Sequence, residues 1–521
     1  MQISRQLTTD VTAMTLAKAI INDGQRVWRS VLAILAAVAA SGIASRAGAQ
    51  TAQPPLAPIR LSDPAALPDP VPLTDPSDSA DEKPFTSGWT ADGSLLEDGT
   101  CDDGGWVGLE MLLDKEDLKK LVESDEEKKE GGGKPTVNLT IELQADSAWF
   151  RQDEDNITAV GEIPDGSFFR RSRFGIFGKL YDAIEYRTEW DFAGDARPRF
   201  LDNWVALTDV PYINNIIVGH YFEPFSLERY TPNRFITFTE RSLTDTFAPA
   251  RNMGAMVYGN LFDERMTWAG GIFRTSSDDY GDSVTFGDDF ALTLHSTFLA
   301  WFEEDDEFTR RLLHLGASGS VRHPGSRQTR FANRPSVRMR EQGVGGVPLF
   351  VDTGDILDVK NYYLYGLEAA WVHGPWSLQG EWIGSTVERR TTDNPRFESA
   401  YIYGTWFLTG ESRSYSPTSI LGRFREGIFQ RVDPRTNVFD RTQGGGWTGC
   451  GAWELAVRWS FIDLNDAGIE GGRIEEMTYG VNWYLNRYTK VMFNYVRPKL
   501  IDPNMGRSRA EAYVARLQFE Y

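Results

Sequence analysis

The segment that decides the fold is the last ten residues of the chain, Ala512-Tyr-Val-Ala-Arg-Leu-Gln-Phe-Glu-Tyr521. Its alternate positions are apolar up to the terminal tyrosine, and Arg516, Gln518 and Glu520 lie between them. A period of two gives a strand one apolar and one polar face. Such a strand fits a sheet with lipid outside and water inside, as in a bacterial outer-membrane barrel. A soluble sandwich strand can alternate in the same way, so the rest of the chain must decide.

The same alternation recurs from Thr136 onward. In the segment 184–192, apolar residues alternate with charged ones, which are Glu185, Arg187, Glu189 and Asp191. A whole strand face of charged residues is costly in a dry core but inexpensive against water. The polar faces are therefore predicted to line a water-filled lumen. A short turn is predicted at Asn486–Arg487, between two further alternating segments.

Residues 134–521 are predicted to form one all-β domain, a transmembrane antiparallel β-barrel. The region has room for 16 strands of about ten residues with their connections, although 14 or 18 would fit nearly as well. A barrel of about this size leaves an aqueous channel unless a loop folds inward.

The amino terminus has the organisation of a secretory signal. Arg26 and Arg29 precede the apolar run 31–40, and Ala47-Gly48-Ala49 supplies a small-residue cleavage site. The run is too short to span a bilayer as a helix. Residues 1–49 are predicted to be a signal peptide, either an extended one or one whose translation starts at Met14. Export without a helical anchor favours the outer membrane.

The segment between the signal and the barrel divides in two. Residues 50–105 are rich in Pro and Asp and are predicted to be a disordered linker. Residues 106–133 have helical spacing and end in three glycines, which predicts a short acidic helix that either self-associates or is simply solvated. Cys101 and Cys450 either pair in an oxidising compartment or remain free.

The composition agrees with a barrel. The chain has 16 Trp, 19 Tyr and 30 Phe, yet its mean hydropathy is negative, as expected for aromatic girdles outside and polar residues inside. The net charge of −20 excludes a uniformly basic protein, so no nucleic-acid partner is expected. With five histidines and no metal-ligand spacing or phosphate loop, no catalytic site, metal or cofactor is predicted.

Several motifs carry a resemblance to a known family. They include Phe168-Phe169-Arg170-Arg171, the stretch from Gly219 to Arg229, Glu240-Arg241-Ser242-Leu243, Gly451-Ala452-Trp453-Glu454-Leu455 and Gly480-Val481-Asn482-Trp483-Tyr484. These motifs are collinear and extend over nearly all of residues 136–521. This part of the chain resembles the phosphate-selective porin O and P family. The resemblance implies a homotrimer of 16-stranded barrels in outer-membrane lipid, each with an inward third loop that narrows the pore.

The resemblance also implies an anion path, with phosphate or other small anions as the solute. Its expected residues are Arg170, Arg171, Asp202, Arg229, Arg234 and Arg241, with Arg334 and Arg338 from a loosely matched ladder of Arg330, Arg334, Arg338 and Arg340. Guanidinium groups present fork-shaped donors to phosphate oxygens, and several weak sites allow both entry and exit. Asp202 is expected to temper the affinity. The ladder would equally suit an external loop that binds lipopolysaccharide.

Two departures from the family pattern affect the function. Glu142 stands where the family has a constriction arginine and would repel phosphate unless paired with Arg171 or Arg173. Several family lysines have no lysine counterpart, although Arg423, Arg425 and Arg431 occupy the corresponding region. The sequence therefore predicts an outer-membrane porin conducting phosphate or related anions. A general, weakly selective pore and a structural barrel that tethers the envelope remain as alternatives.

Overall fold

The computed structural model describes residues 134–193, 198–275, 281, 288–306, 308–339, 346–438 and 449–521. The predicted signal peptide, linker and acidic helix lie outside the described residues, as do Cys101 and Arg340. Cys450 is exposed and forms no disulfide with any described residue.

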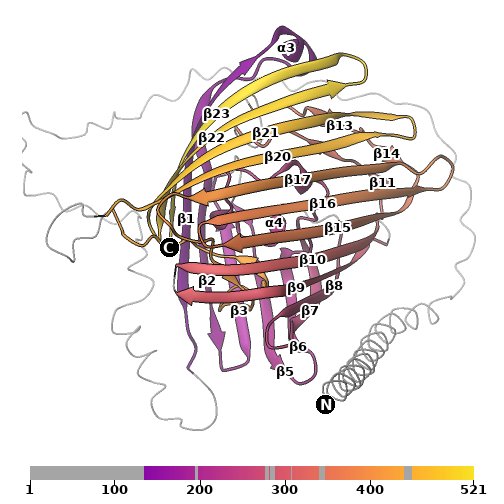
Figure 1. The fold of residues 1–521 in the computed structure, drawn as a ribbon. Helices are drawn as coiled ribbons and strands as arrows, with labels where there is room; N and C mark the ends of the chain where they lie inside the picture. The colour runs from indigo at the N-terminus through magenta and orange to yellow at the C-terminus, as the bar shows by residue number, and fades with distance from the viewer. Residues whose placement is uncertain are drawn as a thin grey trace, which may run out of the picture. The chain divides into compact units, whose positions relative to one another are not determined.

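The described residues form a closed barrel of sixteen antiparallel strands (Figure 1). In order around the wall these are β1 (Asn138–Gln152), β2 (Gly166–Leu180), β3 (Ile184–Asp191), β5 (Asn203–Val210), β6 (Asn214–Phe222), β7 (Arg251–Leu261), β8 (Met266–Phe273), β9 (Phe290–Asp306), β10 (Thr309–His323), β15 (Val359–His373), β16 (Trp376–Arg389), β17 (Arg396–Phe407), β20 (Ala452–Asp466), β21 (Ile469–Asn486), β22 (Thr489–Asp502) and β23 (Gly506–Glu520). Pairing of β1 with β23, with Glu142 opposite Glu520, closes the sheet. The predicted all-β class and the count of 16 are confirmed.

Smaller elements lie in the connections. They are α3 (Glu154–Val160), α4 (Leu227–Tyr230), η2 (Asn233–Phe235), η3 (Leu243–Thr246), and the two-residue strands β4 (Arg199–Phe200), β11 (Gln328–Thr329), β12 (Ala332–Asn333), β13 (Val351–Asp352), β14 (Ile356–Leu357), β18 (Tyr415–Ser416) and β19 (Ile428–Phe429). In the part of the chain that is described, no helix has the length and apolar character needed to cross a bilayer.

Side-chain exposure follows the predicted period of two. On β23, Leu517 and Phe519 are 53% and 41% exposed on the outer face, whereas Arg516 and Gln518 are each 1% exposed inside. Stacked aromatic pairs cover the outer face, such as Trp376 and Trp406 with ring centroids 4.8 Å apart. The barrel therefore has an apolar exterior and a charged interior, as the sequence pattern predicts.

The two ends of the barrel differ in their connections. Short turns join β2 to β3, β5 to β6, β7 to β8, β15 to β16 and β21 to β22 at one end, where β23 also ends. This end is called the turn end here, and the opposite, loop end carries the long connections 223–250 and 324–358. The long connection 408–451 is an exception, because it leaves from the turn end. The turn predicted at 486–487 lies one residue later, at Arg487–Tyr488.

The wall is uneven in height. On one side, β3, β5, β6 and β8 have only eight or nine residues each. On the other side the strands are longer, up to 17 residues in β9 and 18 in β21. We call β3–β8 the short wall, and β9–β23 together with β1 and β2 the long wall.

Candidate functional site

The connection 223–250 folds into the lumen from the loop end and is held there by the barrel wall. Ser226 is the N-cap of its helix α4, and the Ser226 hydroxyl accepts from the Arg229 amide. The amide of Leu227 donates to Glu368 on β15 at 2.8 Å, and the amide of Glu228 donates to Glu381 on β16 at 2.6 Å. Because the first amides of a helix lack partners within it, these wall carboxylates are well suited to fix the loop.

The return half of the same loop is held by β21 to β23. Asn482 donates to the carbonyl of Thr237 at 2.7 Å, and Gln518 donates to the carbonyl of Arg234 at 2.9 Å. The amide of Thr239 donates to Asn494 at 2.7 Å. The loop thus crosses the lumen between distant strands and narrows the passage, in agreement with the expectation of an inward third loop.

A second segment, 408–438, enters the lumen from the turn end. Phe424 packs edge-on against Tyr221 of the wall and Tyr230 of the inward loop, with centroids 5.0 and 6.0 Å apart. Arg425 donates to the carbonyl of Tyr230 at 3.0 Å and to Asp202 at 2.9 Å. The two inward segments therefore meet inside the barrel.

A β-bulge places two neighbouring arginines in the lumen. Along the β1–β2 pairing, Gln144 is opposite Arg171 and Ala145 is opposite Phe169, so Arg170 is the extra residue. A bulge redirects side chains at the point where it interrupts the alternation. Arg170 and Arg171 are accordingly both buried, at 8% and 4% exposure.

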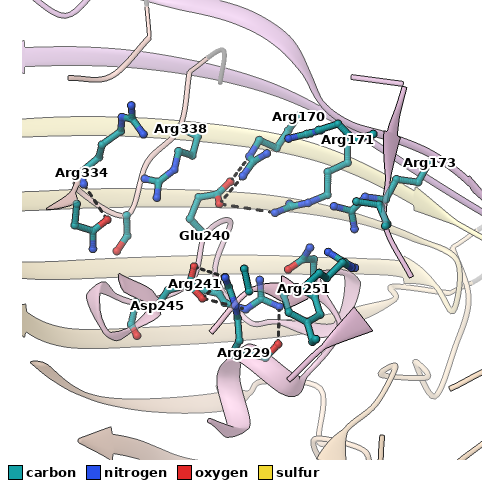
Figure 2. Close-up of a pocket in the computed structure, with 18 of the residues that line it drawn as sticks. Arg170, Arg171, Arg173, Arg229, Glu240, Arg241, Asp245, Arg251, Arg334 and Arg338 are labelled. Atoms are coloured by element: carbon teal, nitrogen blue, oxygen red, sulfur yellow. Dashed lines mark hydrogen bonds and ion pairs between the residues drawn. The ribbon is translucent and has the colours of Figure 1, made fainter. Parts of the chain in front are cut away.

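These arginines line a cavity of about 300 Å³ between the inward loop and the wall, here called the wide cavity (Figure 2). Its guanidinium groups come from β2, β4, the inward loop, β7 and the connection 324–358, and they are Arg170, Arg171, Arg173, Arg199, Arg229, Arg241, Arg251, Arg334 and Arg338. Among the described residues, two carboxylates, Glu240 and Asp245, line the same space. The wide cavity is therefore strongly electropositive.

Glu240 occupies the centre of the arginine group (Figure 2). Its carboxylate accepts from Arg170 at 2.7 Å and from Arg516 at 3.1 Å, and it lies 3.9 Å from Arg171. Burial by itself would raise the pKa of Glu240, but these guanidinium groups more than offset burial and hold the pKa well below its usual range. The residue is thus an ionised, tethered anion among the arginines.

Three arginines of the wide cavity donate to backbone carbonyls. Arg241 donates to the carbonyls of Glu228 and Thr231, Arg334 to that of Val347, and Arg338 to those of Pro335 and Val337, all within the two loops. Burial lowers the pKa of Arg241 to about 10, which still leaves it charged at neutral pH. Carbonyl oxygens fix these side chains without cancelling their charge. Asp245 pairs with Arg229 at 2.6 Å and lies 3.9 Å from Arg241.

A second, narrow cavity of about 30 Å³ lies between the wide cavity and the segment 408–438. Its arginines are Arg173, Arg187, Arg234, Arg251, Arg423 and Arg425, and its carboxylates are Glu142, Glu189 and Asp202. The two cavities share Arg173 and Arg251.

Ion pairs fill the narrow cavity. Asp202 accepts from Arg251 at 2.6 Å and from Arg425 at 2.9 Å, and although burial opposes it, these arginines hold the pKa of Asp202 well below its usual range. Glu142 is paired with Arg173 at 3.3 Å and lies 3.6 Å from Arg234. The pairing that the sequence analysis required for Glu142 is therefore present.

Six of the eight expected path residues line the wide cavity, namely Arg170, Arg171, Arg229, Arg241, Arg334 and Arg338. Asp202 and Arg234 lie instead at the narrow cavity. Arg330, from the same ladder, pairs with Asp352 on an exposed part of the loop. Sequence reasoning did not select Arg199, Arg251, Glu240 or Asp245 as path residues. Glu240 and Arg251 stand in the family motifs Glu240-Arg241-Ser242-Leu243 and Arg251-Asn252-Met253-Gly254, which was the available signal.

Comparison with known proteins identifies the family. The family model described as "Phosphate-selective porin O and P" matches residues 137–521. The chain belongs to this family. Porin O of Pseudomonas aeruginosa is 25% identical over 417 residues, which cover 73% of this chain and 87% of that protein. An uncharacterised protein of Caulobacter vibrioides is 28% identical over 343 residues, covering 63% of this chain and 62% of the relative's length.

Solved outer-membrane proteins have a similar barrel. An anion-selective porin from Comamonas acidovorans gives a TM-score of 0.45 at 11% identity, covering 74% of this chain and all of the other. An outer-membrane protein of Vibrio cholerae in its trimer form gives 0.42 at 8% identity, covering 75% of this chain and all of the other. As a member of the family, this porin is a barrel of the outer membrane and not an enzyme. Short turns face the periplasm in such barrels, so the loop end faces outward.

Proposed function

We propose that this porin conducts phosphate or related small anions across the outer membrane through the wide and narrow cavities. The observation that carries the proposal is the wide cavity itself, in which nine arginines face two carboxylates within about 300 Å³. An anion entering this space exchanges part of its hydration for guanidinium donors. Several arginines, in place of one tight site, supply the stepwise path that conduction needs.

The narrow cavity supports a selective passage. Any solute passing from the wide cavity toward the periplasm meets arginines already paired with Glu142, Glu189 and Asp202. These carboxylates compete with the anion for the guanidinium groups, which keeps the residence time of the anion short. The same carboxylates favour the second candidate, a general and weakly selective pore, because they reduce the net positive charge in the narrow cavity.

Single-channel recording in planar bilayers tests the proposal. The purified porin is measured in chloride, and phosphate is then titrated in. We expect chloride current that saturates with concentration and is inhibited by phosphate. Linear current that phosphate does not affect would support the general pore instead, and absence of current would support a structural barrel.

We also propose a homotrimer in which copies meet at the short wall. An eight-residue strand rises about 26 Å, or about 20 Å along the barrel axis at a tilt of about 40°, which is less than the apolar band of about 25 Å. A partner barrel covers such a wall better than lipid does. We expect Val218→Trp on the short wall (57% exposed) to dissociate the oligomer, and Val457→Trp on the long wall (45% exposed) to leave it intact. Analytical ultracentrifugation in detergent measures the outcome, and an intact oligomer for both variants would refute this interface.

A further inference from the structure

A group of charged side chains lies on the outer face of the long wall near the loop end, where β20 to β23 meet β1. The alternation of each strand turns these residues away from the lumen, and they are Arg151, Arg473, Arg497, Lys499, Arg507 and Arg509 together with Asp463, Glu475 and Glu511. We call them the basic patch. Six basic and three acidic residues leave an excess of three positive charges on a surface that the pore does not use.

The corresponding rim of β15 to β17 shows that this excess is local. There the outward charges are balanced, with Lys360 and Arg396 against Glu388 and Glu398. Lys360 pairs with Glu388 at 2.7 Å. The outward charges near the loop end are therefore balanced on β15 to β17 and in basic excess only at the basic patch, of the two regions compared.

The acidic residues of the basic patch are insufficient for its cations. Glu475 is shared between Arg473 at 2.9 Å and Lys499 at 3.2 Å, and Glu511 lies 3.6 Å from Arg497. Within the described residues, Arg509 makes no side-chain ion pair. Helix α3, which is acidic in its first turn, contacts β23 at two residues. Its N-cap Asp153 accepts from the backbone amide of Arg509 at 2.9 Å, and Asn156 donates to the inward-facing Ser508 at 3.1 Å.

The strand register adds a second observation. Lys499 and Arg509 are direct cross-strand partners on the outer face, and like charges directly opposite each other destabilise a sheet. The same two residues, with Arg497, line a groove of about 240 Å³. The groove is also lined by Glu475 and Glu511 of the basic patch, by the inward-facing Glu476, and by Trp459 and Met477. An anion in this groove would relieve the repulsion, and the two apolar side chains would contact an organic body attached to it.

The depth of the groove indicates where that anion resides. Tyr479, Tyr495 and Tyr513 form a row immediately nearer the barrel middle, with successive ring centroids 6.0 and 4.9 Å apart. Tyrosine rows of this kind lie at the level where acyl chains meet headgroups. The groove is therefore at headgroup depth, at the end of the barrel that faces outward.

We infer that the basic patch binds the phosphate-bearing headgroup of a lipid in the outer leaflet. Guanidinium and ammonium groups at this depth are suited to lipid phosphates, and the patch lies on the long wall, where strands are tall enough to face lipid. The trimer contact proposed above uses the opposite, short wall. This site is independent of anion conduction, so either proposal can fail without the other.

Native mass spectrometry of the full chain in detergent tests the site, with diphosphorylated lipid A as the probe. We expect one lipid A to be retained by the natural protein, and its affinity to fall at least tenfold in the variant Arg497→Gln/Lys499→Gln/Arg509→Gln. The matched control Lys360→Gln/Arg396→Gln removes two cations from the balanced rim and should bind as the natural protein does. Unchanged single-channel current in the triple variant verifies an intact barrel.

Two further measurements use a second variant and a dephosphorylated lipid. Glu475→Gln/Glu511→Gln removes competing carboxylates and should raise the affinity for lipid A. Lipid A with both phosphates removed should not be retained, and millimolar inorganic phosphate should displace the intact lipid only partly, because Trp459 and Met477 contribute. Equal retention of phosphorylated and dephosphorylated lipid, equal affinity in the triple variant, or complete displacement by inorganic phosphate would each overturn the inference.

Discussion

The wide and the narrow cavities are built from the same residue type and share Arg173 and Arg251, yet they differ in how arginine is used. In the wide cavity, Arg334 and Arg338 are fixed by backbone carbonyls, which leave their charge available. In the narrow cavity, arginines are fixed by carboxylates, which consume that charge. The wide cavity has a volume of about 300 Å³, and the narrow cavity, where the ion pairs are, has a volume of about 30 Å³. The partner of an arginine therefore decides whether its charge stays available or is neutralised by an ion pair.

Removing carbonyl-held arginines should give the largest effect. Because a hydrogen bond to a charged group contributes about 1.5–3 kcal/mol, Arg334→Gln/Arg338→Gln should weaken phosphate inhibition of the chloride current by about tenfold to a hundredfold. Single-channel titration measures this change. The control is Arg390→Gln, an exposed position in the connection 390–395. An unchanged inhibition constant would show that the wide cavity does not bind the solute.

Removing the tethered anion should act in the opposite direction. Glu240→Gln keeps an oxygen that accepts from Arg170 but no longer offsets the surrounding guanidinium charges. We expect phosphate affinity to rise several-fold and the saturating current to fall, since a solute bound more tightly leaves more slowly. Glu388→Gln, on the outer face, is the control. A lower affinity instead would mean that Glu240 mainly positions the arginines.

Asp202 tests the narrow cavity. Its carboxylate links Arg251 of β7 to Arg425 of the segment 408–438. Asp202→Asn should raise phosphate affinity about two- to threefold and lower the thermal midpoint by a few degrees, because two buried arginines lose their charged partner. Conductance, phosphate titration and thermal unfolding measure these effects, with Asp263→Asn in an exposed turn as the control. If neither conductance nor affinity changes, Asp202 does not temper binding.

The smallest effect is expected from pH. Glu426, in the segment 408–438, lines a cavity near the turn end, and burial raises its pKa to about 7. It therefore gains negative charge as the pH rises from 6 to 8, which should lower the anion-to-cation permeability ratio by less than about twofold. Reversal potentials in a salt gradient measure the ratio. A Glu426→Gln variant should show no such slope, and an equal slope in both proteins would assign the titration elsewhere.

The sequence predicted features that depend on local periodicity. The alternation in 184–192 and 512–521 placed Arg187, Glu189 and Arg516 in the lumen, where the structure has them. Alternation cannot reveal an interruption, so the bulge at Arg170 was not predicted. Only the family resemblance, and no periodicity, grouped both neighbouring arginines with the path.

The sequence did not predict which distant segments of the chain meet in the lumen. Nothing in the residues 408–438 indicates that they enter the barrel from the turn end, since Phe424 and Arg425 meet partners about 200 positions earlier in the chain. The carboxylates that fix the inward loop, Glu368 and Glu381, read in sequence as ordinary polar positions of two strands. The chain reveals which face a residue occupies, but the partner across the lumen depends on the closed barrel.

The pairing of β1 with β23 has a consequence for biogenesis. The amide of Ile141 donates to the carbonyl of Tyr521 at 3.1 Å, and the amide of Tyr521 donates in return to Ile141 at 2.9 Å. The edge of β1 is therefore exposed until β23 pairs with it. An exposed edge is a template for wrong pairing, so a variant in which β23 cannot pair with β1 is expected to remain an open, aggregation-prone sheet.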